Sequence, residues 1–364
     1  MKFREHTNDA LPARSKSWHL PVSIPLIFPR LPMTTTPKTP ETAWVLTSGA
    51  AGMVNQGLGL AEALLRRLPG LSVINKRVNL RAPWGSLTPF LPRPALSALT
   101  ADSDALNAPW PDLVIGVGRQ SIAPALAIRH ENPSTTLIQL QRPSAWASRF
   151  DVVVPPAHDQ MRAAPNLIES LGALHRVTAD TLEAALPHFS EQIGALNPTR
   201  YAVMIGGNSK THQLTEAALD RLITDLKDLV GASDASLMIS TSRRTGAEAE
   251  ARLREAFDRA PHWFWDGQAP NPYFAFLAAA DAIILTNDSV SMISEAAATG
   301  KPIYLFDLPG DSAKFSRFHD AMEQKGLTEP LPRQPRSPLT TKPRPVLQEA
   351  DRVARLIIER FGWG

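Results

Sequence analysis

The sequence predicts an α/β protein of two doubly wound, Rossmann-like domains that face each other across a cleft. Two observations carry this prediction. Short apolar runs alternate with segments whose apolar residues recur at helical spacing, which is the pattern of successive βαβ units in a parallel sheet. The alternation also starts again near residue 200, and 364 residues are enough for two such domains.

The first domain is expected over residues 41–185. An apolar run at 43–46 ends in Thr47, Ser48 and Gly49, and apolar residues then recur every three or four positions through Leu68, which predicts a helix. A second buried run leads through Gly118 into another helical segment. The expected strands are 43–46, 73–78, 112–117, 137–140 and 152–154.

The second domain is expected over residues 195–329. Its expected strands are 202–205, 237–240, 282–285 and 303–306. Apolar residues between 219 and 229 fall on one helical face, and we expect this helix to begin directly after Lys210. A further helix is expected over 289–299, because Gly300 follows it where a left-handed residue commonly ends a helix.

The two ends of the chain differ from the body. Residues 1–40 contain seven prolines and no apolar periodicity, so they are expected to be a disordered extension. Two interpretations of residues 1–32 stay open: an upstream extension before a start at Met33, or a targeting or membrane-touching tail. Residues 330–345 contain six prolines and predict an extended linker, and 346–364 predict an amphipathic helix that packs back on the body.

Composition excludes several classes of protein. The chain has no cysteine, which excludes a disulfide scaffold, a thiolate metal centre and a cysteine nucleophile. Residues 1–40 hold six basic and two acidic side chains, so the remaining chain has a formal charge of −1 out of the total of +3. A nearly neutral body argues against nucleic-acid binding. We expect a cytoplasmic protein without a resident metal or cofactor, and contact with a membrane surface stays open.

Four loops at predicted strand ends have a composition suited to ligand binding, because doubly wound sheets bind ligands at the carboxyl ends of their strands. The first loop is expected on the acceptor side of the cleft, together with Arg119. Its residues are Ser48, Gly49, Gly52, Asn55 and Gln56. A tight turn without a ligand is the alternative.

The other three loops suit a nucleoside diphosphate. A Walker P-loop is excluded, because Met204 and Ser209 occupy positions that require glycine. Glycines, paired arginines and a helix start can still hold phosphates, and Glu295 lies one turn inside a helix, where a carboxylate can accept both hydroxyls of a ribose. The alternatives are a solvated turn, a solvated charge pair and a surface salt bridge. The residues are Gly206, Gly207, Asn208, Ser209, Lys210, Ser242, Arg243, Arg244, Asn287, Asp288, Ser289, Ser291, Met292 and Glu295.

Two side chains after the strand at 152–154 are candidates for a catalytic base. His158 and Asp159 would face the cleft, although a polar loop pair is an equal alternative. The segment 262–265 is expected to be a buried strand, and a role in stacking on a nucleotide base is the alternative. A short-chain epimerase is disfavoured, because none of the three tyrosines is followed four residues later by lysine.

Residues 278–306 (AAADAIILTNDSVSMISEAAATGKPIYLF) resemble the nucleotide-binding segment of GT-B glycosyltransferases. Seven segments resemble, in order, the mitochondrial-fission "elongated mitochondria" protein family: GAAGMVNQ, DVVVPPAHD, NLIESLGALHRV, IGGNSK, SRRT, NPYFAFLAAAD and TNDSVSMISEAAATGKP. One departure concerns Arg142, which precedes Pro143 where we expect a basic residue to follow the proline.

The resemblance implies a GT-B-like fold and a metal-independent transferase that takes a nucleotide-diphosphate sugar as donor and passes the sugar to an unknown acceptor. Such a transferase would act in the synthesis of cell-envelope or membrane-associated glycans. By the resemblance, Asp288, Ser289 and Ser291 hold the diphosphate and Glu295 holds the ribose. The alternative is a non-catalytic scaffold or nucleotide-binding protein on the same fold, which acts through partners.

Overall fold

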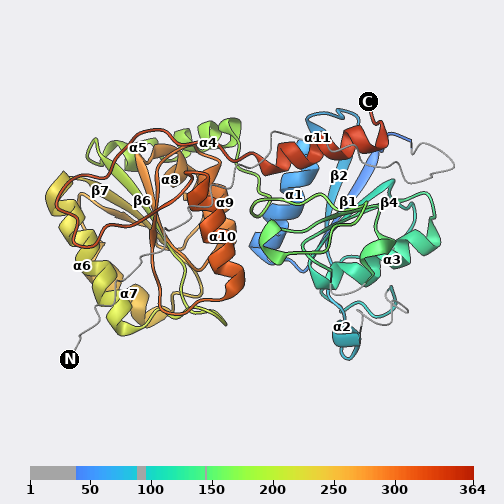
Figure 1. The fold of residues 1–364 in the computed structure, drawn as a ribbon, viewed down its shortest axis with the longest axis horizontal. Coiled ribbons are helices and arrows are strands. Elements are labelled where there is room, and N and C mark those ends of the chain that lie inside the picture. Colours follow the sequence, from blue (N-terminus) through green and yellow to red (C-terminus); the bar gives the residue numbers. More distant parts are fainter. Residues whose placement is uncertain (1–37, 88–95, 144–145) are drawn as a thin grey trace, which may run out of the picture.

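The computed structural model describes residues 38–87, 96–143 and 146–364. The expected extension over 1–40 lies, apart from residues 38–40, outside this part. Figure 1 shows two lobes, each with a sheet flanked by helices. Both sheets are entirely parallel, so the predicted fold class of two doubly wound domains is confirmed.

The first sheet has the strand order β2-β1-β3-β4-β5. Alternate residues of β1 point to opposite faces: Ala43 and Val45 join the core beneath α1, and Trp44 and Leu46 join the core on the α3 side. The strands are β1 (Thr42–Thr47), β2 (Ser72–Arg77), β3 (Leu113–Val117), β4 (Thr136–Leu140) and β5 (Val152–Val154); the helices are α1 (Ala51–Leu65), α2 (Trp84–Leu87) and α3 (Ile122–Glu131), with short 3-10 turns η1 (Arg119–Ser121), η2 (Ala147–Arg149) and η3 (Ala157–Asp159).

The second sheet has the order β11-β10-β9-β6-β7-β8. Residues 201, 203 and 205 of β6 face the core under α6, and residues 202 and 204 face the opposite core, to which α8, α9 and α10 contribute. The strands are β6 (Arg200–Ile205), β7 (Ser236–Thr241), β8 (Trp263–Phe264), β9 (Ala282–Thr286), β10 (Ile303–Phe306) and β11 (Glu329–Pro330); the helices are α6 (Glu216–Ser233), α7 (Ala247–Phe257), α8 (Tyr273–Ala279), α9 (Val290–Ala297) and α10 (Ala313–Gln324).

Two segments tie the domains together. The chain first crosses through the residues around 171–177 to α4 (Ala179–Ala185), η4 (Leu186–Phe189) and α5 (Ser190–Gly194). After β11 it runs back over the second domain, where Leu331 and Leu339 are buried in the core. It ends in α11 (Glu349–Phe361), whose Val353 and Ile357 pack in the core of the first domain next to α1. In the described residues, none of the helices has the length and apolar character required to cross a membrane.

One expectation about a helix start is wrong. The helix expected directly after Lys210 begins at Glu216, where the Thr215 hydroxyl accepts from the backbone N–H of Ala218. Residues 206–215 are therefore a loop. The helix expected over 289–299 is present as α9, within two residues of the expected ends, and Gly300 follows it in the expected left-handed conformation (φ 69°).

Candidate functional site

The loops after β6, β7 and β9 meet at the carboxyl edge of the second sheet around one buried carboxylate. The side chain of Asp288 has no solvent exposure. It accepts hydrogen bonds from the Thr286 hydroxyl (2.6 Å) and from the backbone N–H of Gly207 (3.1 Å). Its second oxygen also pairs with the Arg244 guanidinium at 2.5 Å. Asp288 therefore joins three segments that are about 40 to 80 residues apart in the sequence.

The glycine pair at 206–207 is explained by this crowding. A Cβ on Gly206 would lie 2.1 Å from an Asp288 carboxylate oxygen, and one on Gly207 would lie 2.2 Å from the carbonyl oxygen of Arg244. That carbonyl accepts from the backbone N–H of Asn208 at 2.9 Å. The Ser242 hydroxyl closes the group by donating to the carbonyl of Gly206 at 3.1 Å. The two glycines let the loops pack together whether or not a ligand binds.

Two cations remain available beside this group. Lys210 and Arg243 are exposed, and neither makes an ion pair or a hydrogen bond with the residues that the structure describes. The Ser209 hydroxyl is occupied by the backbone N–H groups of Thr211 and His212. The loops after β6 and β7 therefore each offer one unpaired positive charge at the edge of the sheet, whereas the charge of Arg244 is already neutralised by Asp288.

One face of α9 points at the first domain. Ser289 caps this helix by accepting from the backbone N–H of Met292, and Met292 packs against the core. Ser291 and Glu295 lie one turn apart on the same face. The Gln56 amide approaches the Ser291 hydroxyl at 3.5 Å, and the Asn55 amide donates to Glu295 at 3.3 Å.

Glu295 is almost completely buried, and both of its carboxylate oxygens are occupied. The Tyr273 hydroxyl donates to one oxygen at 2.6 Å, and Asn55 donates to the other. Burial raises the pKa of Glu295, while these two hydrogen bonds oppose the shift. Burial also raises the pKa of Tyr273 well above its ordinary value, so Tyr273 stays a donor.

Both base candidates contact the second domain through α10. The Asp159 carboxylate pairs with the Lys314 ammonium at 2.7 Å. The His158 ring is buried edge-on against Phe318, and its Nδ1 has no partner among the described residues. The Arg317 guanidinium donates to the His158 carbonyl at 2.9 Å. Burial, reinforced by the charge of Lys314, lowers the pKa of His158 to about 4, so the ring is neutral at pH 7.

We expect stability to depend on pH because of His158 and His175. Burial lowers the pKa of each from 6.5 to about 4. Between these two pKa values the unfolded chain binds more protons than the folded chain, so the contribution of the two histidines to the free energy of unfolding is constant above about pH 6.5 and decreases as the pH falls toward 4. Urea denaturation at a series of pH values between 4 and 6.5 measures this dependence. The free energy of unfolding should change less steeply with pH in His175→Gln than in the wild type. The exposed His188→Gln should keep the wild-type slope, and equal slopes in all three proteins would contradict the assignment.

The remaining predicted residues are dispersed. The Ser48 hydroxyl points to the Met53 sulfur (3.2 Å), and Gly49 takes φ 84° in the turn before α1. The exposed Arg119 donates to the carbonyl of Gly85. Arg142 is exposed and donates to the carbonyl of Asp159 at 3.3 Å. None of these four makes a described contact with the second domain.

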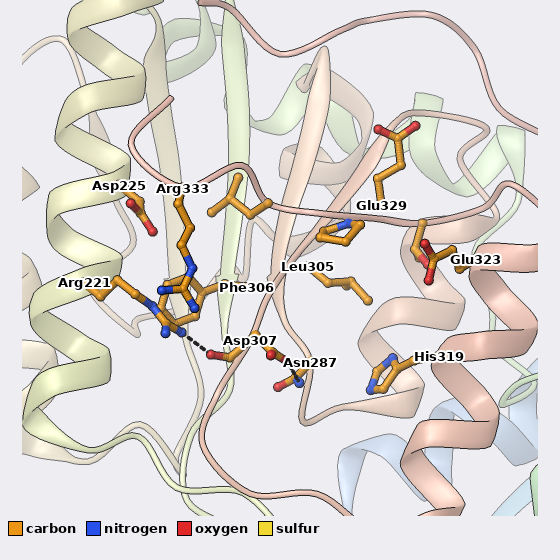
Figure 2. Close-up of a pocket in the computed structure, with 13 residues that line it drawn as sticks. Arg221, Asp225, Asn287, Leu305, Phe306, Asp307, His319, Glu323, Glu329 and Arg333 are labelled. Carbon is orange, nitrogen blue, oxygen red and sulfur yellow. Dashed lines mark hydrogen bonds between the residues drawn. The ribbon is translucent and has the colours of Figure 1, made fainter. Parts of the chain in front are cut away.

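Asn287 is tied to the end of β10 instead of the group around Asp288. Its amide donates to the Asp307 carboxylate at 2.5 Å and accepts from the backbone N–H of Leu308. Figure 2 shows Asn287 with Asp307 at one side of a cavity of about 290 Å³ between α6 and α10. Arg221 borders the cavity, stacks over Phe306 and donates to the carbonyl of Asp307.

Two polar residues of the site escaped the sequence analysis. Tyr273 starts α8 and reaches Glu295 only because α8 and α9 pack in the same core. Gln141 follows β4 in a left-handed conformation (φ 67°), which is uncommon for a residue other than glycine, and its amide donates to Gln56 at 3.1 Å. Polar residues directly after the buried strand 137–140 are the signal that could have indicated Gln141.

Comparison with known proteins agrees with the resemblance of the motifs. The model of the family Mitochondrial fission ELM1 matches residues 51–361. The chain belongs to this family. It is 30% identical to the mitochondrial fission protein ELM1 of Arabidopsis thaliana over 60% of the chain, and the match spans 56% of the Arabidopsis protein. It is 26% identical to the uncharacterized protein RP120 of Rickettsia prowazekii over 78% of the chain and 88% of that protein.

Solved structures show the fold. A putative UDP-N-acetylglucosamine 2-epimerase from Listeria monocytogenes matches with a TM-score of 0.56 and 12% identity, covering 88% of this chain and 97% of that one. The S. aureus MnaA-UDP co-structure matches with a TM-score of 0.51 and 11% identity, covering 88% and 89%. The chain therefore has the GT-B-like fold of these proteins.

Proposed function

We propose that the chain is a GT-B-type glycosyltransferase that takes a nucleotide-diphosphate sugar as donor. The observation that carries the proposal is the convergence of the loops after β6, β7 and β9 on Asp288, next to the unpaired cations Lys210 and Arg243. A family member would place its donor at this edge, because doubly wound domains bind ligands at the carboxyl ends of their strands.

The diphosphate would bind against the loop 206–210 and the first turn of α9, where the backbone N–H groups of Val290 and Ser291 precede the first intrahelical hydrogen bonds. Asp288 is buried and already paired, so its role would be to position this loop. Lys210 and Arg243 would neutralise the charge that develops on the departing nucleoside diphosphate, which is the electrostatic task that metal ions perform in other transferases.

The nucleoside would be recognised through Glu295, whose carboxylate can accept from both hydroxyls of a ribose. The structural neighbour from S. aureus is a complex with UDP, so uridine nucleotides are the first to test. Asn55 and Tyr273 now occupy the two oxygens that such a diol would need.

Transfer would require a base on the side of the first domain. The base removes the proton of an acceptor hydroxyl, the acceptor oxygen bonds to the anomeric carbon, and the nucleoside diphosphate leaves with the electrons of the broken C–O bond. His158 is a neutral imidazole at pH 7 but must first be exposed from its packing against Phe318, and Asp159 must first leave Lys314. The acceptor would enter along residues 48–56 and Arg119.

Glu295→Ala should abolish stabilisation by UDP in a thermal-shift titration. Ligand at about 100 times its dissociation constant adds roughly 2.7 kcal/mol to the wild type, which corresponds to several degrees. For the wild type, 2′-deoxy-UDP should bind about ten- to a hundredfold more weakly than UDP, because one hydrogen bond to a carboxylate is lost. Glu255 is an exposed carboxylate on α7, and Glu255→Ala should be stabilised by UDP as much as the wild type. Equal binding of both nucleotides would contradict the role of Glu295.

A second candidate is a scaffold or nucleotide-binding protein on the same fold. It is favoured by one observation: both oxygens of Glu295 and the carboxylate of Asp159 are engaged by protein groups, two of which come from the opposite domain. A transferase would lose turnover of its donor in His158→Ala or Asp159→Asn, while its nucleotide affinity would persist. A scaffold would retain partner binding in both variants.

A further inference from the structure

The two domains touch directly where the nucleoside is proposed to bind. From the first domain, the start of α1 contributes Gly52, Asn55 and Gln56, and from the second domain α9 contributes Ser291 and Glu295. A Cβ placed on Gly52 would be only 3.7 Å from the Ser291 hydroxyl oxygen. We call this contact the α1–α9 latch.

The latch uses the atoms that a ribose would use. The Glu295 carboxylate has one donor on each oxygen, Asn55 at 3.3 Å and the Tyr273 hydroxyl at 2.6 Å. Tyr273 belongs to the same domain as Glu295, so its hydrogen bond persists when the domains move apart. The Asn55 hydrogen bond cannot persist, because α1 belongs to the other domain.

The latch is weak enough to open. The amide of Gln56 is 3.5 Å from Ser291, and the bond from Asn55 is also longer than an ordinary hydrogen bond. Gln56 in turn accepts from Gln141, so the contact continues to the end of β4. A nucleoside that supplies two hydroxyl donors to Glu295 can replace Asn55 at this carboxylate.

We propose that the α1–α9 latch is an autoinhibitory contact: Asn55 competes with the ribonucleoside for Glu295, so the donor binds only when α1 moves away from α9. This inference rests on the proposed function. The apparent dissociation constant for UDP should then equal the dissociation constant of the open protein divided by the fraction of molecules in which the latch is open. Asn55→Ala should therefore bind UDP about three- to tenfold more tightly than the wild type.

The absence of cysteine allows the latch to be locked. A Cβ on residue 52 would lie 3.7 Å from the Ser291 hydroxyl oxygen, so we expect Gly52→Cys/Ser291→Cys to form a disulfide in the closed state. Oxidation should form one bond, visible as a loss of two hydrogens in intact mass. UDP titration by calorimetry should then show at least tenfold weaker binding for the oxidised protein, and a reductant should restore it. Ser291→Cys alone has no partner thiol, so its own UDP affinity should be the same before and after treatment with the oxidant, whatever that affinity is relative to the wild type.

Each outcome decides the inference. Equal UDP affinity of the oxidised and reduced double variant, or failure of the disulfide to form, would overturn the latch. If the reduced double variant binds poorly because Ser291 is changed, Asn55→Ala decides, with the exposed Asn75→Ala as its matched control. Binding by Asn55→Ala that is no tighter than wild type would overturn the competition while leaving nucleotide binding intact. No binding of UDP, GDP, ADP or CDP by any variant would instead overturn the proposed function, and the competition with it.

Discussion

Asp288→Ala is expected to lower the free energy of unfolding of the second domain by about 2–4 kcal/mol. The substitution removes the carboxylate that accepts from Thr286 and Gly207 and pairs with Arg244. Losing one partner of a buried ion pair costs about 3–5 kcal/mol, and the partial exposure of Arg244 reduces this figure. For domains of this size, the melting temperature should decrease by roughly 5–15 °C.

The matched control is Asp220→Ala, which breaks an Asp–Arg pair with Arg252 on the surface. Because exposed pairs contribute about 0–1 kcal/mol, this variant should melt close to the wild type. Thermal unfolding followed by circular dichroism compares the two variants. Similar melting temperatures for Asp288→Ala and Asp220→Ala would show that Asp288 does not hold the three loops together.

Gly59→Ala should destabilise the first domain by about 2–3 kcal/mol, although alanine is the better helix former. Gly59 lies in the middle of α1, and a Cβ there would be 2.4 Å from the carbonyl oxygen of His175 and 2.5 Å from its carbonyl carbon. These are backbone atoms of the segment that crosses between the domains, so no side-chain rotation relieves the clash.

Gly231→Ala is the control for this prediction. Gly231 lies near the end of α6, and a Cβ added there would meet no other part of the described chain within 4 Å. Alanine should therefore stabilise the protein by roughly 0.5–1 kcal/mol. Urea denaturation should give shifts of opposite sign for the two substitutions. A stabilising effect of Gly59→Ala would contradict the close packing of α1 on residue 175.

The parallel sheets could be predicted from the sequence because every central strand is a short apolar run. Residues 303–306 and 152–154 coincide with β10 and β5, and the other predicted strands differ by one or two residues at their ends. α10 was missed by the sequence analysis, although its Phe315, Phe318 and Met322 recur at helical spacing. The two-residue strand β11 is too short to leave a pattern.

Topology alone places the loops of the candidate site at one edge of the sheet. It does not predict which side chains from these loops contact one another. Asp288 pairs with Arg244, and Glu295 accepts from Tyr273 and Asn55. These contacts depend on packing between segments that are 22 to 240 residues apart in the sequence. The early start expected for α6 failed because the polar residues after Gly207 fold into a turn in which Ser209 accepts from two backbone N–H groups.

Calorimetric titration of the full chain with UDP, GDP, ADP and CDP tests the central claim most directly. If the carboxyl edge of the second sheet is a donor site, one of these nucleotides should bind in a saturable manner with one site per chain. Its affinity should decrease in Lys210→Ala and Arg243→Ala, which remove the unpaired cations. Absence of binding by all four nucleotides, on protein that melts cooperatively, would contradict the donor site and favour a scaffold that retains only the fold.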